Sequence, residues 1–360
     1  MAPTGSSWYD PVSTVRLRIT PLRHAGGMAT GEAKLHHFVP RFYLARWSHV
    51  DLLDVRRRDG GRFTAKPTKV AAINGFYDFH DDDGEVSKAV EKFLADEVEA
   101  PASEAFRSID ASGRAPAPHT SERQAMCAFI AFQMTRTPER RAEIMLAEAV
   151  RAFLDGRELT EPLMAEYLES VHLGFAPSER EVRAAVAWIG YQLYQLGTGT
   201  REEAMRIMHS IAVEFMPKLA EMHWSIAVDR KQRFVTADQP VLIWKQPSPR
   251  DAFMGVGLQT ADEVRLPLDP GKVLVLRHRP RTETVRLSPS EVQQCNRDIA
   301  HRCHTFIVGS PRQSATIDSL PLRARGPAMR FNVANRWDRD DDGRLFKTDE
   351  EILHTWVSRD

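Results

Sequence analysis

The chain has 360 residues, of which 42% are hydrophobic and 27% are charged, and its 49 basic side chains balance its 49 acidic ones. This composition is typical of a folded globular protein and excludes a chain that is disordered throughout. The zero net charge argues against a nucleic-acid coat protein or a polybasic membrane binder, because both need excess positive charge. Three cysteines are too few for a disulfide framework, so we expect a cytoplasmic protein.

Residues 1–33 contain scattered Pro, Gly and Arg and lack the apolar stretch of a signal peptide. We expect them to be a disordered or misassigned extension, and translation starts either at Met1 or at Met28. A dense run of aromatic and apolar residues begins at Lys34 and predicts the start of the folded domain. No uncharged apolar run reaches the roughly 18 residues of a membrane span, so we expect no contact with a membrane.

Short elements are predicted at the start of the domain. Pro40 suits the first turn of a short helix that runs through Trp47. Gly60 and Gly61 then separate two runs of strand-like length, which predicts a hairpin over 52–67.

A helical region is predicted from about 85 to 222, because apolar residues recur there at helical spacing. Prolines, among them Pro101, are its expected helix boundaries. Short β-branched runs bounded by Pro, Gly or Asp then predict strands. These strands are 224–229, 233–238, 241–244, 263–268, 272–277 and 306–310.

The last helix of the domain is predicted at 288–303, where Ser288 can cap the helix, Pro289 suits its first turn and Glu291 completes a capping box. The order of elements predicts an α+β fold, with a central helical bundle layer packed on a small, mostly antiparallel sheet. We expect one domain over 34–322, followed by a polar acidic tail over 323–360.

His36 and His37 are the first candidate catalytic residues, because histidine titrates near neutrality and is the commonest metal ligand. Adjacent residues of an extended chain point in different directions, so we expect at most one imidazole to face a site. Tyr43 follows in the same apolar block and is a candidate substrate contact. The alternative interpretation is a pair of partly buried histidines held by hydrogen bonds.

Asp238 is the second candidate, because it ends a predicted strand just before the turn that Pro240 forces. A carboxylate in this position can act as a metal ligand or a general base. An aspartate two residues before proline is also an ordinary turn former. In the catalytic interpretation, His37 and Asp238 are the ligands of a divalent ion.

Polar side chains inside the predicted helices form the third group. Glu91 and Arg136 are expected to pair across two helices, and Gln133 lies on an apolar helix face. A buried amide without partners costs about 1–3 kcal/mol, so either a structural network or a substrate must satisfy Gln133. Basic clusters at 56–58, 140–141 and 277–281 fit phosphate contacts if they converge, and each alone fits a solvated face.

The tail carries a pattern typical of a calcium-binding loop. Asp338, Asp340 and Asp342 occupy loop positions 1, 3 and 5, and Gly343 occupies position 6. Position 12 is Asp349 where an EF-hand has a bidentate Glu, which would weaken Ca²⁺ binding or favour Mg²⁺. The other interpretation is an acidic, solvated tail.

Several common motifs are absent from the sequence, namely GxGxxG, GxxxxGK(S/T), GxSxG and HExxH. Their absence argues against a Rossmann cofactor site, a P-loop, an α/β-hydrolase elbow and a zincin. Cys295, His301, Cys303 and His304 fit no common zinc spacing, so we interpret them as packing residues.

The motif HHFVPRFYLARW at 36–47 resembles a bacterial family called domain of unknown function 4238 (DUF4238). That family opens with His-His-x-Val-Pro-x-x-Tyr-Leu and also has a Thr-Ser-Asp-x-Pro-Val segment, which is TADQPV here, and an Asn in the last helix, which is Asn296 here. Ala237 stands where the family usually has Ser. The resemblance implies no particular reaction, and it groups His36, His37, Asp238 and Asn296 as one constellation. Further matching segments are GFYDF (75–79) and PLDPGKVLVL (267–276).

From these features we expect a metal-dependent hydrolase that acts on a phosphodiester, such as a nuclease, with a nucleic acid or nucleotide as partner. A divalent ion (Mg, Mn or Zn) would activate water, Glu91 would complete the site, Arg136 would neutralise phosphate, and Gln133 and Asn296 would contact the substrate. The rival hypothesis is a non-catalytic binding or interaction module. Convergence of these residues in one open cleft favours the enzyme, and their burial in closed hydrogen-bonded pairs favours the module.

Overall fold

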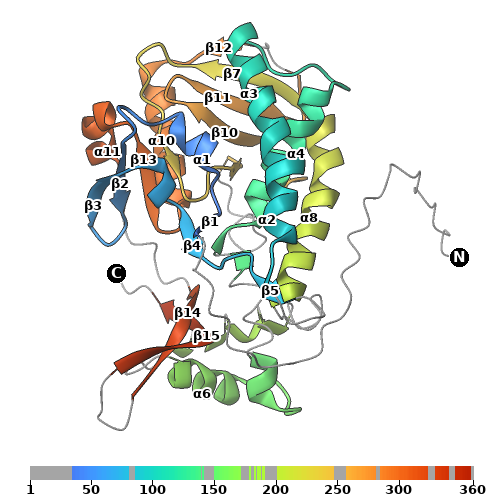
Figure 1. Cartoon of the computed structure of the whole chain (residues 1–360), viewed down its shortest axis with the longest axis vertical. Coiled ribbons are helices and arrows are strands. Elements are labelled where there is room, and N and C mark those ends of the chain that lie inside the picture. Colours follow the sequence, from blue (N-terminus) through green and yellow to red (C-terminus); the bar gives the residue numbers. More distant parts are fainter. Residues whose placement is uncertain are drawn as a thin grey trace, which may run out of the picture.

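The structure is a computed structural model that describes most of the chain from Leu35 to Val357 (Figure 1). Helices and mostly antiparallel sheets pack together in it, which confirms the predicted α+β class. No helix among the described residues is both long enough and apolar enough to span a membrane. The described residues are 35–80, 86–138, 140–141, 150–171, 178–179, 182–183, 185–187, 189–190, 201–246, 257–280, 284–322, 329–339 and 345–357.

The main helical layer contains three long helical segments. A continuous helical stretch consists of α2 (Ala89–Phe93), the π-helical turn η2 (Leu94–Glu99) and α3 (Ala100–Ser112). Helix α4 (Ser121–Thr135) packs against both α3 and α8 (Arg201–Glu221). Ten residues of α4 are buried, which makes it the centre of this layer.

The expected helix boundary at Pro101 is wrong, because the helix continues through this residue. In an α-helix the ring of Pro101 would clash with the carbonyl of Glu97, four residues before it. The wider π-helical turn that precedes Pro101 gives the ring room. The stretch ends instead at Gly113, which has a φ of +68° and therefore suits a left-handed C-terminal cap.

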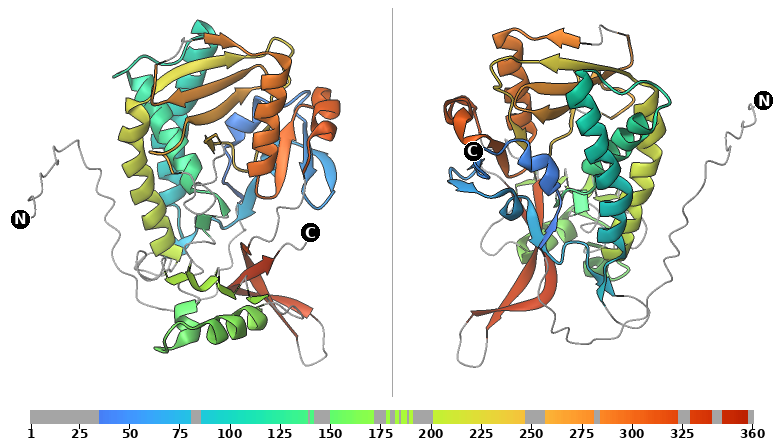
Figure 2. Two further views of the ribbon diagram at one scale, coloured as in Figure 1. Left: turned by 180° about the vertical axis from the view of Figure 1, so that it is seen from behind. Right: turned by 45° about the horizontal axis from the view of Figure 1, so that its top comes forward.

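Two sheets provide the rest of the main body, where the sequence predicted one. The larger has the order β12-β7-β11-β10-β9, and only the β12–β7 pair is parallel. Its strands are β7 (His223–Val228), β9 (Leu242–Trp244), β10 (Glu263–Asp269), β11 (Lys272–Arg277) and β12 (Thr284–Arg286). This sheet covers one end of the long helices, and Figure 2 shows it from behind (left) and with the top of the molecule turned forward (right).

The smaller sheet has the order β3-β2-β13-β8. It confirms the predicted hairpin as β2 (Leu53–Arg57) and β3 (Arg62–Ala65), and it adds β8 (Thr236–Ala237) and β13 (Phe306–Gly309). Helix α10 (Pro289–Arg302) contacts both β8 and β13. Ser288 caps α10 with the predicted capping box.

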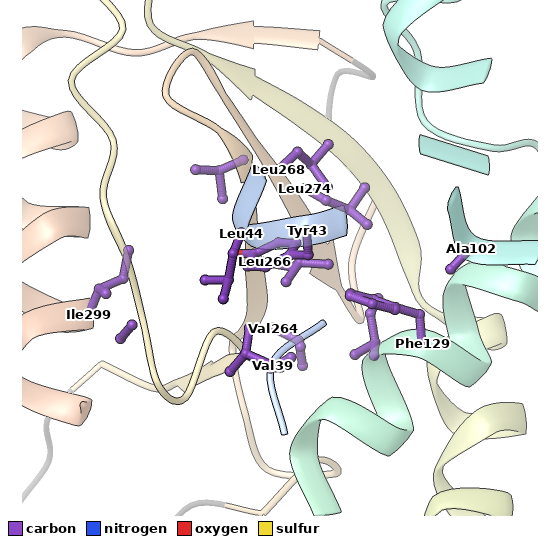
Figure 3. Packing of buried hydrophobic residues seen from close by; sticks show 14 of the residues in the cluster. Val39, Tyr43, Leu44, Ala102, Phe129, Val264, Leu266, Leu268, Leu274 and Ile299 are labelled. Atoms are coloured by element: carbon purple, nitrogen blue, oxygen red, sulfur yellow. The ribbon is translucent and has the colours of Figure 1, made fainter. Parts of the chain in front are cut away.

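One hydrophobic core joins both sheets to the long helices. The short helix α1 (Arg41–Ala45) lies at its centre, where Tyr43 and Leu44 pack between the strands of the larger sheet and residues of α3 and α4 (Figure 3). Tyr43, Leu44 and Phe129 are completely buried, and each contributes about 1.5–3 kcal/mol through burial. This packing fixes the segment before α1, which carries the two candidate histidines.

Smaller elements surround this core. Strands β1 (Leu35–His37) and β4 (Ala72–Asn74) pair with each other, as do β5 (Phe79–His80) and β6 (Val86–Ser87). The turns η1 (Pro67–Lys69) and η3 (Pro311–Gln313) and helix α11 (Ser314–Ser319) follow β3 and β13. Helix α6 (Glu161–Val171) belongs to a second hydrophobic cluster.

The C-terminal segment forms a hairpin of β14 (Met329–Arg339) and β15 (Leu345–Val357), and β15 contacts α6. The helices that an EF-hand places on either side of its loop are not formed here, because both flanking segments are strands. Asp338 lies in β14 and pairs with Phe346. Asp340 and Asp342 lie outside the described residues.

Candidate functional site

His36 lies in β1 and is held on both sides of its imidazole ring. The backbone N–H of Tyr77 donates to Nδ1 at 2.9 Å, and the two rings stack with centroids 5.6 Å apart. Because Nδ1 accepts a hydrogen bond, the neutral ring carries its proton on Nε2. Nε2 faces Glu91 at 3.5 Å and Asp78 at 3.7 Å. His36 is 3% exposed, so its ring is enclosed by the protein.

His37 faces a different environment, as expected for its neighbour on a strand. Burial lowers the pKa of His37, while the carbonyl of Pro67 and the charge of Glu99 act in the opposite direction. Its Nε2 atom is buried and has no hydrogen-bond partner among the residues that the structure describes. This imidazole is therefore neutral at pH 7.

Gln133 and Arg136 join Glu99 in a closed network at the C-terminal end of α4. The Gln133 amide donates to the carbonyl of Phe38 at 2.9 Å, and Gln133 Oε1 accepts two hydrogen bonds from the Arg136 guanidinium. Arg136 also donates to Glu99 at 2.8 Å and is completely buried. The predicted pairing of Arg136 with Glu91 is wrong, since Glu91 faces His36.

Tyr43 and Asn296, the other two candidate substrate contacts, are buried in the protein. The Tyr43 hydroxyl lies 2.7 Å from both Thr236 Oγ1 and the carbonyl oxygen of Pro267, and burial raises the pKa of its phenol. Asn296 accepts from the N–H of Val235 and donates to the carbonyl of Arg233. Both side chains therefore connect elements of the fold.

Asp238 follows β8 and accepts hydrogen bonds from three consecutive backbone N–H groups, those of His304, Thr305 and Phe306. It thereby fixes the turn between α10 and β13. Burial raises the pKa of Asp238, while His304 and the three N–H groups act in the opposite direction. Asp238 is 3% exposed.

The two most specific sequence motifs meet at an open pocket of about 580 Å³, which we call the Phe38 pocket. Phe38 comes from the His-His motif, and Asp238 and Gln239 come from the TADQP segment. Of the eight candidate residues from 36 to 296, only Asp238 lines it. Other lining residues come from β3, from Lys69–Ile73, from Thr137–Pro138 and from His304–Phe306.

Gln133 lines a smaller neighbouring pocket of about 290 Å³, which shares Thr137 and Gln239 with the Phe38 pocket. The structure therefore brings the candidates into adjacent regions without placing their polar groups in one cleft.

Two features of the Phe38 pocket were missed from the sequence. His304, interpreted there as a packing residue, lies on the pocket wall beside Asp238. Ala71, also on the wall, has a φ of +54°, which is a strained conformation for a residue other than glycine. Neither residue carries a local sequence signal for this position.

The basic cluster at 56–58 is divided between structural and exposed roles. Arg56 donates to three carbonyl oxygens at the end of α11, and Arg58 donates to carbonyl oxygens at the end of α10. Arg57 is about half exposed and pairs with Asp59 at 2.8 Å. Of the other clusters, Arg141 donates to the carbonyl of Phe76, and Arg277 pairs with Glu263.

The described residues were also searched for metal ligands. No group of three or more His, Cys, Asp or Glu side chains in this part of the chain could hold a metal ion. Of the predicted ligands, Asp238 lines the Phe38 pocket, whereas His37 lines neither this pocket nor the neighbouring one.

The family model for proteins of unknown function DUF4238 matches residues 35–313. The chain belongs to the DUF4238 family. The match includes the His-His motif, the TADQP segment and α10, and it ends before the C-terminal hairpin. No curated protein and no solved structure matches the chain. Membership in DUF4238 therefore supports the predicted family and leaves the reaction open.

Proposed function

We propose that the chain is a non-catalytic binding module that holds a nucleotide in the Phe38 pocket. The observation that carries this proposal is the meeting of the two family motifs at an open pocket, while the side chains expected to perform catalysis are held in closed contacts.

The contacts of the candidate acids and bases favour binding over hydrolysis. A general base needs an accessible lone pair within hydrogen-bond reach of the substrate. Asp238 uses its carboxylate on three backbone N–H groups, and His36 uses Nδ1 on the N–H of Tyr77. Arg136 is fully buried against Gln133 and Glu99, so it is not available to a phosphate.

The walls of the Phe38 pocket fit the base of a nucleotide. Phe63 of β3 is 43% exposed and Ile73 of β4 is 39% exposed, although both are large apolar side chains. Nucleotide bases stack on exposed aromatic rings without requiring a particular base, and each stacked base contributes about 1–3 kcal/mol. The volume of about 580 Å³ lies within the usual range of small-molecule sites.

The rim of the same pocket fits a phosphate group. Lys69 is exposed and lines the pocket, and Arg57, which is about half exposed and pairs with Asp59, lines it too. Gln239 and Thr137 supply polar groups between the apolar wall and the neighbouring small pocket. An apolar wall with a cationic rim matches the division of a nucleotide into base and phosphate.

The test is isothermal titration of the full-length protein with the four ribonucleoside monophosphates. We expect Phe63→Ala to weaken binding by about tenfold or more, and Lys69→Ala to weaken it and reduce its salt dependence. Val213→Ala is the matched control, because Val213 is 48% exposed and lies on α8, outside the pocket. Circular dichroism verifies that each variant is folded.

Two results contradict the proposal. The first is an affinity that Phe63→Ala and Val213→Ala leave equally unchanged, or an absence of binding at millimolar concentration. The second is turnover: if the wild-type protein cleaves a nucleotide and His304→Ala does not, the pocket beside Asp238 is catalytic and the hydrolase hypothesis is correct.

A further inference from the structure

A second pocket, of about 630 Å³, lies outside the Phe38 pocket and shares no lining residue with it. We call it the Arg230 pocket. Four segments form it: 46–49 at the end of α1, 228–232 after β7, 269–272 in the turn between β10 and β11, and 310–313 after β13. None of the candidate residues from the sequence lines this pocket.

Five cationic side chains line the Arg230 pocket, and two of them have carboxylate partners. Arg46 and Lys272 both pair with Asp110 and Asp269, at distances from 2.6 to 3.3 Å. These carboxylates raise the pKa of Arg46 against the lowering effect of burial. This part of the pocket is therefore balanced in charge.

The other carboxylate of the pocket, Asp229, is also fully used. It accepts from the N–H groups of Lys231 and Arg233 and from the Arg233 guanidinium at 2.9 Å. Gln313 donates its amide to the carbonyl of Gln232 at 2.7 Å. These bonds fix the 229–233 loop, so the positions of its exposed side chains are set by the fold.

Three cations of the pocket remain: Arg230, Lys231 and Arg312. Each is exposed, and none forms an ion pair within the described part of the chain. They extend from two segments that are held together by the Gln313 amide. Like charges held close together without counter-charges favour binding of a multivalent anion.

We propose that the Arg230 pocket binds a ligand with adjacent phosphate groups, such as inorganic pyrophosphate or the diphosphate of a nucleotide. Arginine donates in pairs to phosphate oxygens, and lysine adds a point charge. The pocket has few apolar walls, so its ligand is recognised through charge. This site is independent of the nucleotide site proposed above.

The experiment is titration of the full-length protein with inorganic pyrophosphate. We expect the double variant Arg230→Ala/Lys231→Ala and the single variant Arg312→Ala each to weaken binding by about tenfold or more. Raising the salt from about 0.05 M to about 0.5 M weakens the wild-type affinity, because the cations are exposed. Arg297→Ala, which removes an exposed cation of α10 outside the pocket, leaves the affinity unchanged.

Two further comparisons separate this site from the Phe38 pocket and identify the source of the phosphates. Phe63→Ala leaves pyrophosphate binding unchanged. ADP binding that exceeds pyrophosphate binding at the Arg230 pocket assigns a nucleotide diphosphate, and the reverse assigns the free anion. Pyrophosphate binding that is absent, or that the Arg230, Lys231 and Arg312 variants reduce no more than Arg297→Ala, overturns the proposal.

Discussion

Replacement of Arg136 by methionine tests whether the Gln133–Arg136–Glu99 network is structural. Arg136 is completely buried, while the Glu99 side chain is 26% exposed. At their separation of 2.8 Å, the gross attraction between the two charges is about 6 kcal/mol with an effective dielectric constant of about 20. Desolvation offsets part of this attraction, and the loss of one partner from a buried pair typically costs about 3–5 kcal/mol.

We expect Arg136→Met to lower the free energy of unfolding by about 3 kcal/mol, the low end of that range, because water still reaches Glu99. Methionine fills most of the space of the arginine side chain. The lost stability therefore arises from the unpaired oxygens of Gln133 and Glu99 more than from a cavity. Urea denaturation, monitored by circular dichroism, measures this loss of unfolding free energy. The control is Arg107→Ala, which removes a 73% exposed partner of a surface ion pair and changes stability by about 0.5 kcal/mol or less.

A loss below about 1 kcal/mol for Arg136→Met would refute the structural interpretation. Loss of nucleotide affinity in a variant that keeps its stability would have the same consequence, because it would place Arg136 in contact with the ligand. Glu99→Gln separates charge from hydrogen bonding, since the amide keeps an acceptor for Arg136.

Three further predictions concern the same contacts. Asn296→Ala leaves the buried N–H of Val235 without its acceptor and lowers the free energy of unfolding by about 1–3 kcal/mol in urea denaturation; an unchanged midpoint would show that water replaces the amide. Ser288→Ala removes the cap of α10 and costs about 1 kcal/mol, measured in the same way, whereas Ser290→Ala, two residues later and inside the helix, costs less. The lowered pKa of His37 predicts that its contribution to stability is present above about pH 6.5 and is lost as the pH falls, because the unfolded chain takes up the proton first. His37→Gln therefore shows a smaller decline in unfolding free energy than the wild type between about pH 7.5 and about pH 5.5, and parallel declines would contradict the assignment.

Local rules predicted most elements of the main body. The Gly60–Gly61 hairpin and the capping box at Ser288 were both found where the sequence placed them, because each depends on residues within one turn. The C-terminal hairpin was missed because the spacing of its acidic residues resembles a calcium loop, and that spacing carries no information about the flanking pairing. The error at Pro101 arose because a π-helical turn can accommodate a proline ring that an α-helix rejects.

The sequence showed that Gln133 needed partners and could not supply their identity. Glu91 and Glu99 lie eight residues apart on one helical stretch, and each could be projected onto the face toward α4 if that stretch were a regular α-helix. The π-helical turn Leu94–Glu99 changes the angular register between them. As a result Glu91 faces His36, and Glu99 pairs with Arg136 in place of Glu91. A projection of the stretch as a regular α-helix does not include this change of register.

The basic clusters show that the number of Arg and Lys residues in a sequence does not indicate how many of these side chains can bind a ligand. Arg56 lies in β2 and Arg58 in the turn that follows it, and they donate to carbonyl oxygens at the C-terminal ends of α11 and α10, respectively. The partial negative charge at a helix C-terminus stabilises a cation there. Both guanidiniums are therefore engaged in structural contacts. Arg230 and Lys231 differ because they form no ion pair within the described part of the chain, and the carboxylate of their loop, Asp229, is already bound by Arg233. Whether a cation is available to a ligand is therefore decided by the carbonyl and carboxylate groups that tertiary packing brings to it, and the sequence does not show these.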